Sequence, residues 1–177
     1  MFDHSDVRSN FPILSRQVNG KPLVYLDNGA SAQKPQVVID AISTAYSHEY
    51  ANVHRGLHYL SNLATDKYEN VRSIIARFLG VADERQIIMN SGTTEGINTV
   101  AYGWAMSRLQ PGDEILLSIM EHHANIVPWH FLRERQGVVV KWVETDAEGG
   151  LDPQTVIDAI TPRTKLLAIT QMSNVLG

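Results

Sequence analysis

Cysteine is absent from the sequence, which has 177 residues. This absence excludes a disulfide framework, cysteine-ligated zinc and thiol catalysis within these residues. Long apolar runs are also missing, because no stretch approaches the roughly 18 residues that a membrane-spanning helix needs. The opening residues, MFDHSDVRSNFP, are acidic and contain no apolar stretch typical of a signal peptide. We therefore expect a cytoplasmic protein that does not cross a membrane.

Basic residues are few and scattered. Fifteen Lys and Arg stand against 19 Asp and Glu, which gives a formal net charge of −4. Affinity for nucleic acid depends on clustered Lys and Arg that neutralise phosphates, so no nucleic-acid partner is expected. The hydrophobic fraction of 44% is ordinary for a globular protein. The length suffices for one domain that buries roughly two-thirds of its unfolded surface.

Helical patterns dominate the first 80 residues. The predicted helices cover residues 4–11, 35–50 and 62–79. Apolar side chains recur on one face of the second and third helices, and Gly80 is typical of a helix end. The run PLVY at 22–25 is predicted to include a short strand. The segment ANVHRGLHYLS at 51–61 has no clear period and is predicted to be a loop.

After residue 80 the pattern changes to short apolar runs that alternate with helical spacing. The runs with strand character are QIIMN (86–90), EILLS (114–118), VVVKWVE (138–144) and KLLAIT (165–170). The helical segments between them cover residues 93–109, 124–136 and 152–160. Alternating strands and helices predict an α/β fold, with a mainly parallel sheet sandwiched by helices.

Polar clusters follow three of these apolar runs. They are SGTTEG (91–96), SIMEHHAN (118–125) and TQMSNVLG (170–177). Ligands of open parallel sheets bind beyond the carboxyl ends of the strands, so the three clusters are predicted to form one site. The sequence stops directly after a buried-type strand, which would leave an unmatched apolar edge. We expect it to be the front part of a longer protein.

The cluster SGTTEG has the character of a phosphate site. A helix N-terminus offers unpaired backbone N–H groups, Gly92 permits close approach, and Thr93 and Thr94 add hydroxyl groups. An ordinary N-cap explains the same residues equally simply. In the second cluster, the ring of His122 has the chemistry to stack on a planar cofactor or to transfer a proton. Alternatively, His122 is a loop histidine without a functional role. Asn174, in the third cluster, is either a ligand-binding amide or a turn residue.

Metal binding is not expected. The available histidines are His54 and His58, which are four residues apart, together with His122, His123 and His130. The sequence has no cysteine and no H-E-x-x-H motif to support a metal site. Arg55, in the loop NVHRGLH, is either a carboxylate or phosphate ligand or a solvent-exposed arginine.

Five segments together resemble a known family. They are YLDNGASAQKPQVVIDA, NVHRGLHYLS, SGTTEGIN, SIMEHHANIVPW and LLAITQMSNVLG. In this order they are similar to the first half of a Suf-type cysteine desulfurase, a pyridoxal-phosphate enzyme of the class-V aminotransferase group. The resemblance implies the large domain of fold-type I pyridoxal-phosphate transferases, incomplete at its C-terminus. It makes residues 1–60 an N-terminal arm, first helix and active-site-entrance loop, and residues 61–177 the first part of the large domain.

The resemblance also implies roles for residues of the three clusters. Thr93 and Thr94 match the threonines that hold the cofactor phosphate, and His122 matches the histidine that stacks on the pyridine ring and serves catalysis. Asn174 matches the asparagine that contacts cofactor and substrate. Ser91 departs from the family pattern, which usually has arginine there; this puts a subunit contact in doubt rather than phosphate binding.

Two further segments are linked to the substrate by the resemblance. Gly29 and Ala30 match the small-residue turn at the substrate end of the site, although Gly29 stands where alanine is more usual. His54 and Arg55 match the loop near the active-site entrance and the dimer partner.

The implied function is conversion of L-cysteine to L-alanine by a homodimer. Its persulfide sulfur would pass to a Suf-type acceptor protein for iron–sulfur cluster assembly. The family's Schiff-base lysine, pyridine-pairing aspartate and persulfide cysteine lie beyond the SNVLG motif and match nothing here, so we expect this chain alone to be inactive. The alternatives are a selenocysteine lyase acting on L-selenocysteine, another class-V aminotransferase-like enzyme, or a non-catalytic dimerising module.

Pyridoxal phosphate is expected to form no stable adduct with any lysine of this chain. The lysines are Lys21, Lys34, Lys67, Lys141 and Lys165. None matches the Schiff-base position of the family. Borohydride reduction followed by peptide mass mapping checks this expectation, and stoichiometric labelling of one lysine would contradict it.

Overall fold

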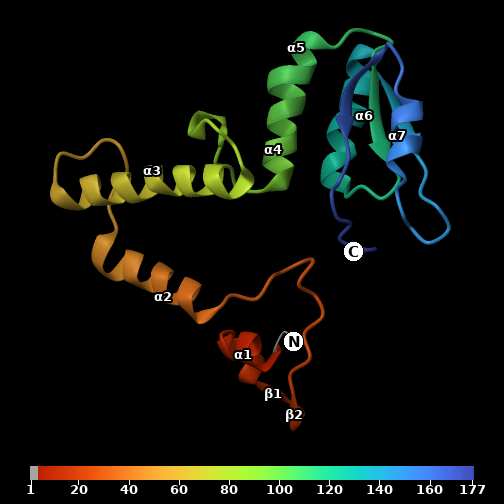
Figure 1. Cartoon of the computed structure of the whole chain (residues 1–177). Coiled ribbons are helices and arrows are strands. Elements are labelled where there is room, and N and C mark those ends of the chain that lie inside the picture. The colour runs from red at the N-terminus through yellow and green to blue at the C-terminus, as the bar shows by residue number, and fades with distance from the viewer. Residues whose placement is uncertain (1–3) are drawn as a thin grey trace. The chain divides into compact units, whose positions relative to one another are not determined.

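The computed structural model describes residues 4–177 and divides into two compact units, Met1–Ile88 and Met89–Gly177 (Figure 1). Each unit is described by itself. The first is mainly helical, and the second contains a parallel sheet with helices. The functional division at residue 60 that the family resemblance implies stays a prediction.

Three α-helices are the main elements of the first unit. They are α1 (His4–Ser9), α2 (Gln36–Thr44, continued by the π-helix η2, Ala45–Glu49) and α3 (Tyr59–Leu79). All three predicted helices are confirmed, and α3 begins earlier than residue 62. His58 caps it by accepting a hydrogen bond from the Ser61 backbone N–H at 3.4 Å, and Gly80 ends it in the left-handed conformation with φ 69°.

Short elements complete the first unit. They are the 3₁₀ helices η1 (Pro12–Ser15) and η3 (Glu84–Gln86) and the antiparallel strands β1 (Gln17–Val18) and β2 (Lys21–Pro22).

Two predicted strands are wrong. The PLVY run contributes only Pro22 to β2, and the chain leaves the ladder after it. The QIIMN run starts at the end of η3 and continues without strand pairing. A strand needs a hydrogen-bonded neighbour. In PLVY the pairing is confined to Pro22, opposite Gln17, and to the Leu23 N–H, which donates to the Arg16 carbonyl at 2.9 Å. QIIMN has no strand partner within residues 4–177. Apolar composition alone does not reveal whether a neighbour exists.

The sheet of the second unit confirms the other three predicted strands. They are β3 (Glu114–Ser118), β4 (Val139–Val143) and β5 (Thr164–Ala168), in the order β4-β3-β5. Both pairs are parallel, with Ile115 opposite Val140 and Leu116 opposite Leu167. Every residue of β3 is buried. The predicted α/β fold with a parallel sheet is therefore confirmed.

Helices cover both faces of this sheet. A continuous helical run is formed by α4 (Thr93–Thr99), the π-helix η4 (Val100–Ala105) and α5 (Met106–Arg108). The other helices are η5 (His123–Asn125), α6 (Val127–Gln136) and α7 (Pro153–Ala159).

Alternate residues of β3 point to opposite faces of the sheet. Ile115 and Leu117 pack with Trp129 of α6 and with the α4–η4 run, whereas Leu116 packs with Val156 of α7. Figure 1 shows α4 and α7 on opposite sides of the strands. The predicted sandwich is confirmed.

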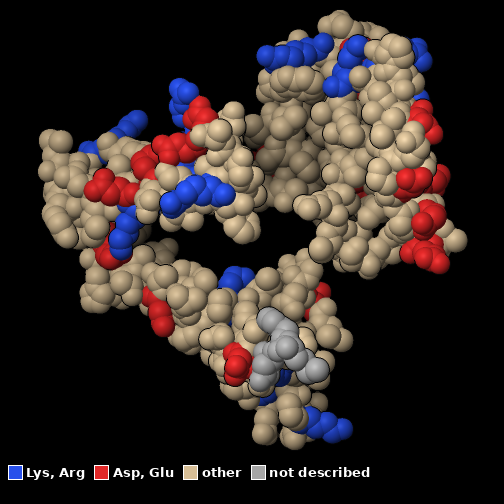
Figure 2. Space-filling model, viewed as in Figure 1, with Lys and Arg blue, Asp and Glu red and all other residues tan. Residues whose placement is uncertain are grey.

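A buried carboxylate lies at the amino end of β3. Glu114 is 2% exposed and accepts a hydrogen bond from the Thr161 hydroxyl at 2.6 Å. Its oxygens also face Arg163 Nη2 at 3.2 Å and Lys141 Nζ at 3.5 Å. Figure 2 shows Lys and Arg side chains gathered at this end of the second unit. The Thr161 hydrogen bond is the main cause that lowers the pKa of Glu114; Thr164, Lys141 and Arg163 act in the same direction, and burial opposes them.

Replacement Glu114→Gln is expected to reduce the free energy of unfolding at neutral pH. Because the folded-state pKa lies below the ordinary value of 4.5, the carboxylate stabilises the fold fully above that value and loses its contribution as the pH falls. Urea unfolding followed by tryptophan fluorescence, from neutral to acid pH, measures the difference. It should shrink on acidification, and the exposed control Glu148→Gln should show no such difference. A difference in the free energy of unfolding that stays the same at every pH would contradict the proposed role of the Glu114 carboxylate.

Candidate cofactor-binding site

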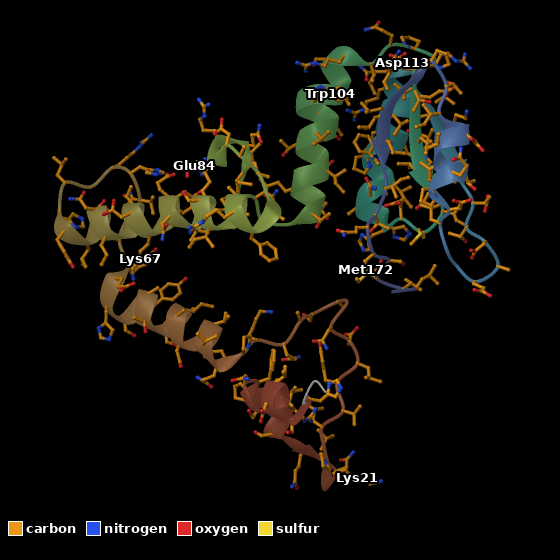
Figure 3. The ribbon with its side chains drawn as sticks, in the orientation of Figure 1. Lys21, Lys67, Glu84, Trp104, Asp113 and Met172 are labelled. Atoms are coloured by element: carbon orange, nitrogen blue, oxygen red, sulfur yellow. The ribbon has the colours of Figure 1, made fainter. Side chains whose placement is uncertain are left out.

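The three polar clusters line one cavity of about 610 Å³ in the second unit. Its lining consists of Ser91, Gly92, Thr93, Thr94, Glu95, Asn98, His122, Ala124, Thr170, Met172 and Asn174. Figure 3 shows Met172 at the opposite end of this unit from Asp113, which precedes β3. The cavity therefore lies beyond the carboxyl ends of β3 and β5. The predicted convergence of the clusters is confirmed.

One wall of the cavity is the start of α4. Gly92 is its N-cap, and the first helical hydrogen bond runs from the Gly96 N–H to the Gly92 carbonyl at 3.1 Å. The backbone N–H groups of Thr93 and Thr94 precede that bond, so they have no partner within the helix. A Cβ added to Gly92 would meet no heavy atom within 4 Å. This helix start leaves space and donors for an anionic group.

Glu95 ties the turn before α4 to the first turn of the helix. Its Oε2 accepts hydrogen bonds from the Ser91 hydroxyl and from the Ser91 N–H, the latter at 2.6 Å. The hydroxyl, followed by the N–H, holds the pKa of Glu95 below its ordinary value. The carboxylate therefore shapes the turn that precedes α4.

His122 presents an exposed ring to the cavity. Its Nδ1 accepts a hydrogen bond from the Ala124 N–H at 3.1 Å, which assigns the proton of the neutral ring to Nε2. The neighbouring His123 does not line this cavity. Its ring lies 6.1 Å from that of His122 and is tilted by 47°. Of the adjacent histidines, one lines the cavity: His122 caps the 3₁₀ helix η5, and His123 begins it.

Asn174 lies in a tight turn after β5. The buried Ser173 hydroxyl oxygen accepts hydrogen bonds from the N–H groups of Val175 and Leu176, both at 3.1 Å. The Thr170 hydroxyl donates to the Met172 carbonyl at 2.9 Å. These local bonds shape the segment that carries Asn174 along the cavity wall.

Glu121 has a structural role that sequence reasoning missed. Its carboxylate is 8% exposed and accepts hydrogen bonds from Ser118, Asn125 and Thr170. In the sequence it is one acidic residue of the SIMEHHAN cluster. The available signal was an acid three residues beyond the end of a strand with a wholly apolar centre, where a carboxylate is close to buried backbone.

The remaining candidate residues belong to the first unit. His54 has φ 69°, and its Nε2 lies 2.6 Å from Glu69 Oε1, while Arg55 is exposed. Gly29 and Ala30 lie in a turn closed by the Ala30 N–H, which donates to the Asp27 carbonyl at 3.2 Å. The substrate roles of these residues stay predictions.

Within residues 4–177, no group of three or more His, Asp or Glu side chains is arranged to bind a metal ion. No helix in this part of the chain has the length and apolar character needed to cross a bilayer.

Comparisons with known proteins agree with the motifs. The family model described as Aminotransferase class-V matches residues 24–177. Probable cysteine desulfurase 1 of Mycobacterium leprae (strain TN) is 51% identical over 100% of this chain and 29% of the relative. The cysteine desulfurase of Salmonella newport (strain SL254) is 51% identical over 99% of this chain and 43% of the relative. The solved apo structure of cysteine desulfurase from Thermococcus onnurineus NA1 is 36% identical, with a TM-score of 0.88, over 100% of this chain and 42% of that one.

Replacement Gly92→Ala is expected to destabilise the second unit although no atom obstructs the new methyl group. Its φ of 138° and ψ of 173° lie in a region essentially restricted to glycine, with a penalty of about 1–3 kcal/mol for other residues. The matched control is Gly103→Ala in η4, where the added Cβ also meets no atom within 4 Å. Because alanine favours a helix interior, that change should stabilise by about 0.5–1 kcal/mol. Urea unfolding measures the change in the free energy of unfolding for each variant. Equal changes in Gly92→Ala and Gly103→Ala would contradict the prediction.

Proposed function

The chain belongs to the class-V aminotransferase family, and we propose that it forms the part of a cysteine desulfurase that binds the phosphate and ring of pyridoxal phosphate. It is homologous to cysteine desulfurases over less than half of their length. The observation that supports the proposal best is the cavity on which the three polar clusters converge.

The donors at the start of α4 fit a phosphate group. The N–H groups of Thr93 and Thr94 and their hydroxyls provide neutral donors, and the helix dipole favours negative charge there. Gly92 adds space, because a Cβ there would occupy an otherwise open volume. The Glu95 carboxylate is engaged by Ser91. In the proposed function these residues bind the phosphate and set the position of the ring.

His122 and Asn174 fit the aromatic and polar parts of the cofactor. The exposed His122 ring is a flat surface for stacking, and it is oriented through its Nδ1. Asn174 supplies an amide that can donate and accept hydrogen bonds. When bound, pyridoxal phosphate supplies an electron sink for chemistry at the substrate α-carbon. The residues described here orient it and contribute a substrate-facing amide.

The proposal extends to the whole enzyme. Its substrate is L-cysteine, its products are L-alanine and persulfide sulfur, and it acts as a cytoplasmic homodimer with a Suf-type acceptor that serves iron–sulfur cluster assembly. Gly29, Ala30, His54 and Arg55 belong to the substrate end. Because these 177 residues contain no cysteine, they supply no thiol to receive the sulfur. We therefore propose that the chain alone is inactive.

Pyridoxine 5′-phosphate tests the cofactor site without lysine chemistry, because it lacks the aldehyde. Isothermal titration is expected to show binding to the chain. The double variant Thr93→Val/Thr94→Val should weaken that binding roughly tenfold or more through loss of hydroxyl hydrogen bonds to a charged group. The control Thr99→Val, on the same helix and outside the cavity lining, should bind like the unsubstituted chain.

The ring contact is tested separately. His122→Ala should weaken binding of pyridoxine 5′-phosphate and leave binding of inorganic phosphate unchanged, because only the former has a ring to stack. Absence of binding by the unsubstituted chain, or an equal loss in Thr99→Val, would contradict the proposed site.

A further inference from the structure

A carboxylate–amide pair lies behind the cavity wall, and of its two side chains Glu121 is buried and Asn125 is half-buried. Oε1 of Glu121 accepts hydrogen bonds from the Ser118 hydroxyl at 2.5 Å and from the Thr170 N–H at 2.9 Å. Its Oε2 accepts a hydrogen bond from Asn125 Nδ2 at 2.8 Å. Ser118 ends β3, and Thr170 follows β5, so one carboxylate joins the exits of two neighbouring strands.

The orientation of the Asn125 amide is defined by its partners. Nδ2 also donates to the Ala168 carbonyl at 3.0 Å, and Oδ1 accepts a hydrogen bond from Trp129 Nε1 at 3.1 Å. A flipped amide would place Oδ1 against two acceptors and Nδ2 against the indole N–H. Both amide protons and the amide oxygen are therefore used, and Trp129 anchors the pair to the core at 2% exposure.

This pair encloses the turn that carries His122. Glu121 precedes His122, Asn125 follows three residues later, and between them the Ala124 N–H donates to His122 Nδ1 at 3.1 Å. On the other side, Thr170 lines the same cavity as His122 and begins the segment that leads to Asn174. A second cavity of about 340 Å³ has Glu121 and Asn125 in its wall together with Thr93, His122 and Thr170.

We propose that Glu121 and Asn125 are positioning residues, which hold the His122 turn and the Thr170–Asn174 segment in their binding arrangement before the cofactor enters. This inference rests on the proposed function. Neither residue lines the 610 Å³ cavity, and the Glu121 carboxylate is bonded to Thr170, which does line it. A buried carboxylate is tolerated only when its oxygens are satisfied, which makes the arrangement sensitive to the loss of any one donor.

Replacement Glu121→Gln keeps the shape of the side chain and replaces one acceptor oxygen by an N–H donor. The new amide donor faces the Asn125 amide donor if Oε1 keeps its two hydrogen bonds. Asn125→Asp instead places a second carboxylate beside Glu121 and the Ala168 carbonyl. The swapped double variant, Glu121→Gln/Asn125→Asp, restores a donor–acceptor match between the pair and leaves the Ala168 carbonyl unpaired. The arrangement of the two segments should therefore be less perturbed in the double variant than in Asn125→Asp alone.

Hydrogen exchange on the chain without cofactor measures the positioning directly. In Glu121→Gln, the Thr170 amide, which donates to Glu121, should exchange roughly tenfold faster, the loss expected for a hydrogen bond to a charged group. The Ala124 amide, which donates to His122 Nδ1, should also exchange faster, because the turn between Glu121 and Asn125 is held less firmly. The Leu116 amide, in the centre of β3, reports global unfolding. Glu148→Gln is the exposed control, and Val156→Ala is a core variant that should change exchange mainly through global stability. Equal acceleration of Leu116, Ala124 and Thr170 in Glu121→Gln would overturn the inference.

Affinity for pyridoxine 5′-phosphate provides the second measurement. Glu121→Gln and Asn125→Asp should each weaken binding roughly tenfold, and the swapped pair should recover part of the loss. If the unsubstituted chain binds and Glu121→Gln binds equally well, the positioning role is overturned and the proposed function stands. If the unsubstituted chain does not bind, the proposed site fails, while the exchange rates still decide whether the pair positions the two segments.

Discussion

The complete burial of β3 is the constraint on which the second unit depends. Its residues, Glu114–Ser118, pack against helices on both faces, and both neighbouring strands run parallel to it. Parallel pairing brings the carboxyl ends together, so the loops after β3 and β5 meet at one edge of the sheet. Burial also forces polar groups at the strand ends to find partners inside the protein. Glu114 does so at one end and Ser118, through Glu121, at the other.

The candidate site therefore has two layers. The front layer offers groups to a ligand: the start of α4, the His122 ring and Asn174. The rear layer, formed by Glu121 and Asn125, joins β3, β5 and α6 through hydrogen bonds of 2.5–3.1 Å. Loops at strand ends are free to vary in conformation, whereas a buried network with every polar group paired allows few alternatives. In the proposed arrangement, the rear layer holds the loop residues of the front layer in defined positions.

Periodicity predicted the helices and failed where strand pairing decides. The helices α2, α3, α6 and α7 were predicted because their apolar side chains recur at helical spacing, and β3 because its centre is a short apolar run. The run QIIMN has the same apolar character as β3 and is not a strand, since no neighbour pairs with it within residues 4–177. Hydrogen-bond partners of a strand come from distant segments, which local composition does not reveal.

The sequence by itself determined the α/β class, the three polar clusters and the family resemblance, because periodicity and motif spacing are local properties of the chain. Tertiary structure decided which strands pair, that the clusters line one cavity, and that Glu121 is buried rather than a solvated loop charge. The physical reason is that burial and hydrogen-bond partnership depend on segments distant in sequence: Glu121 is satisfied in part by Thr170, which reaches it only when β5 pairs with β3.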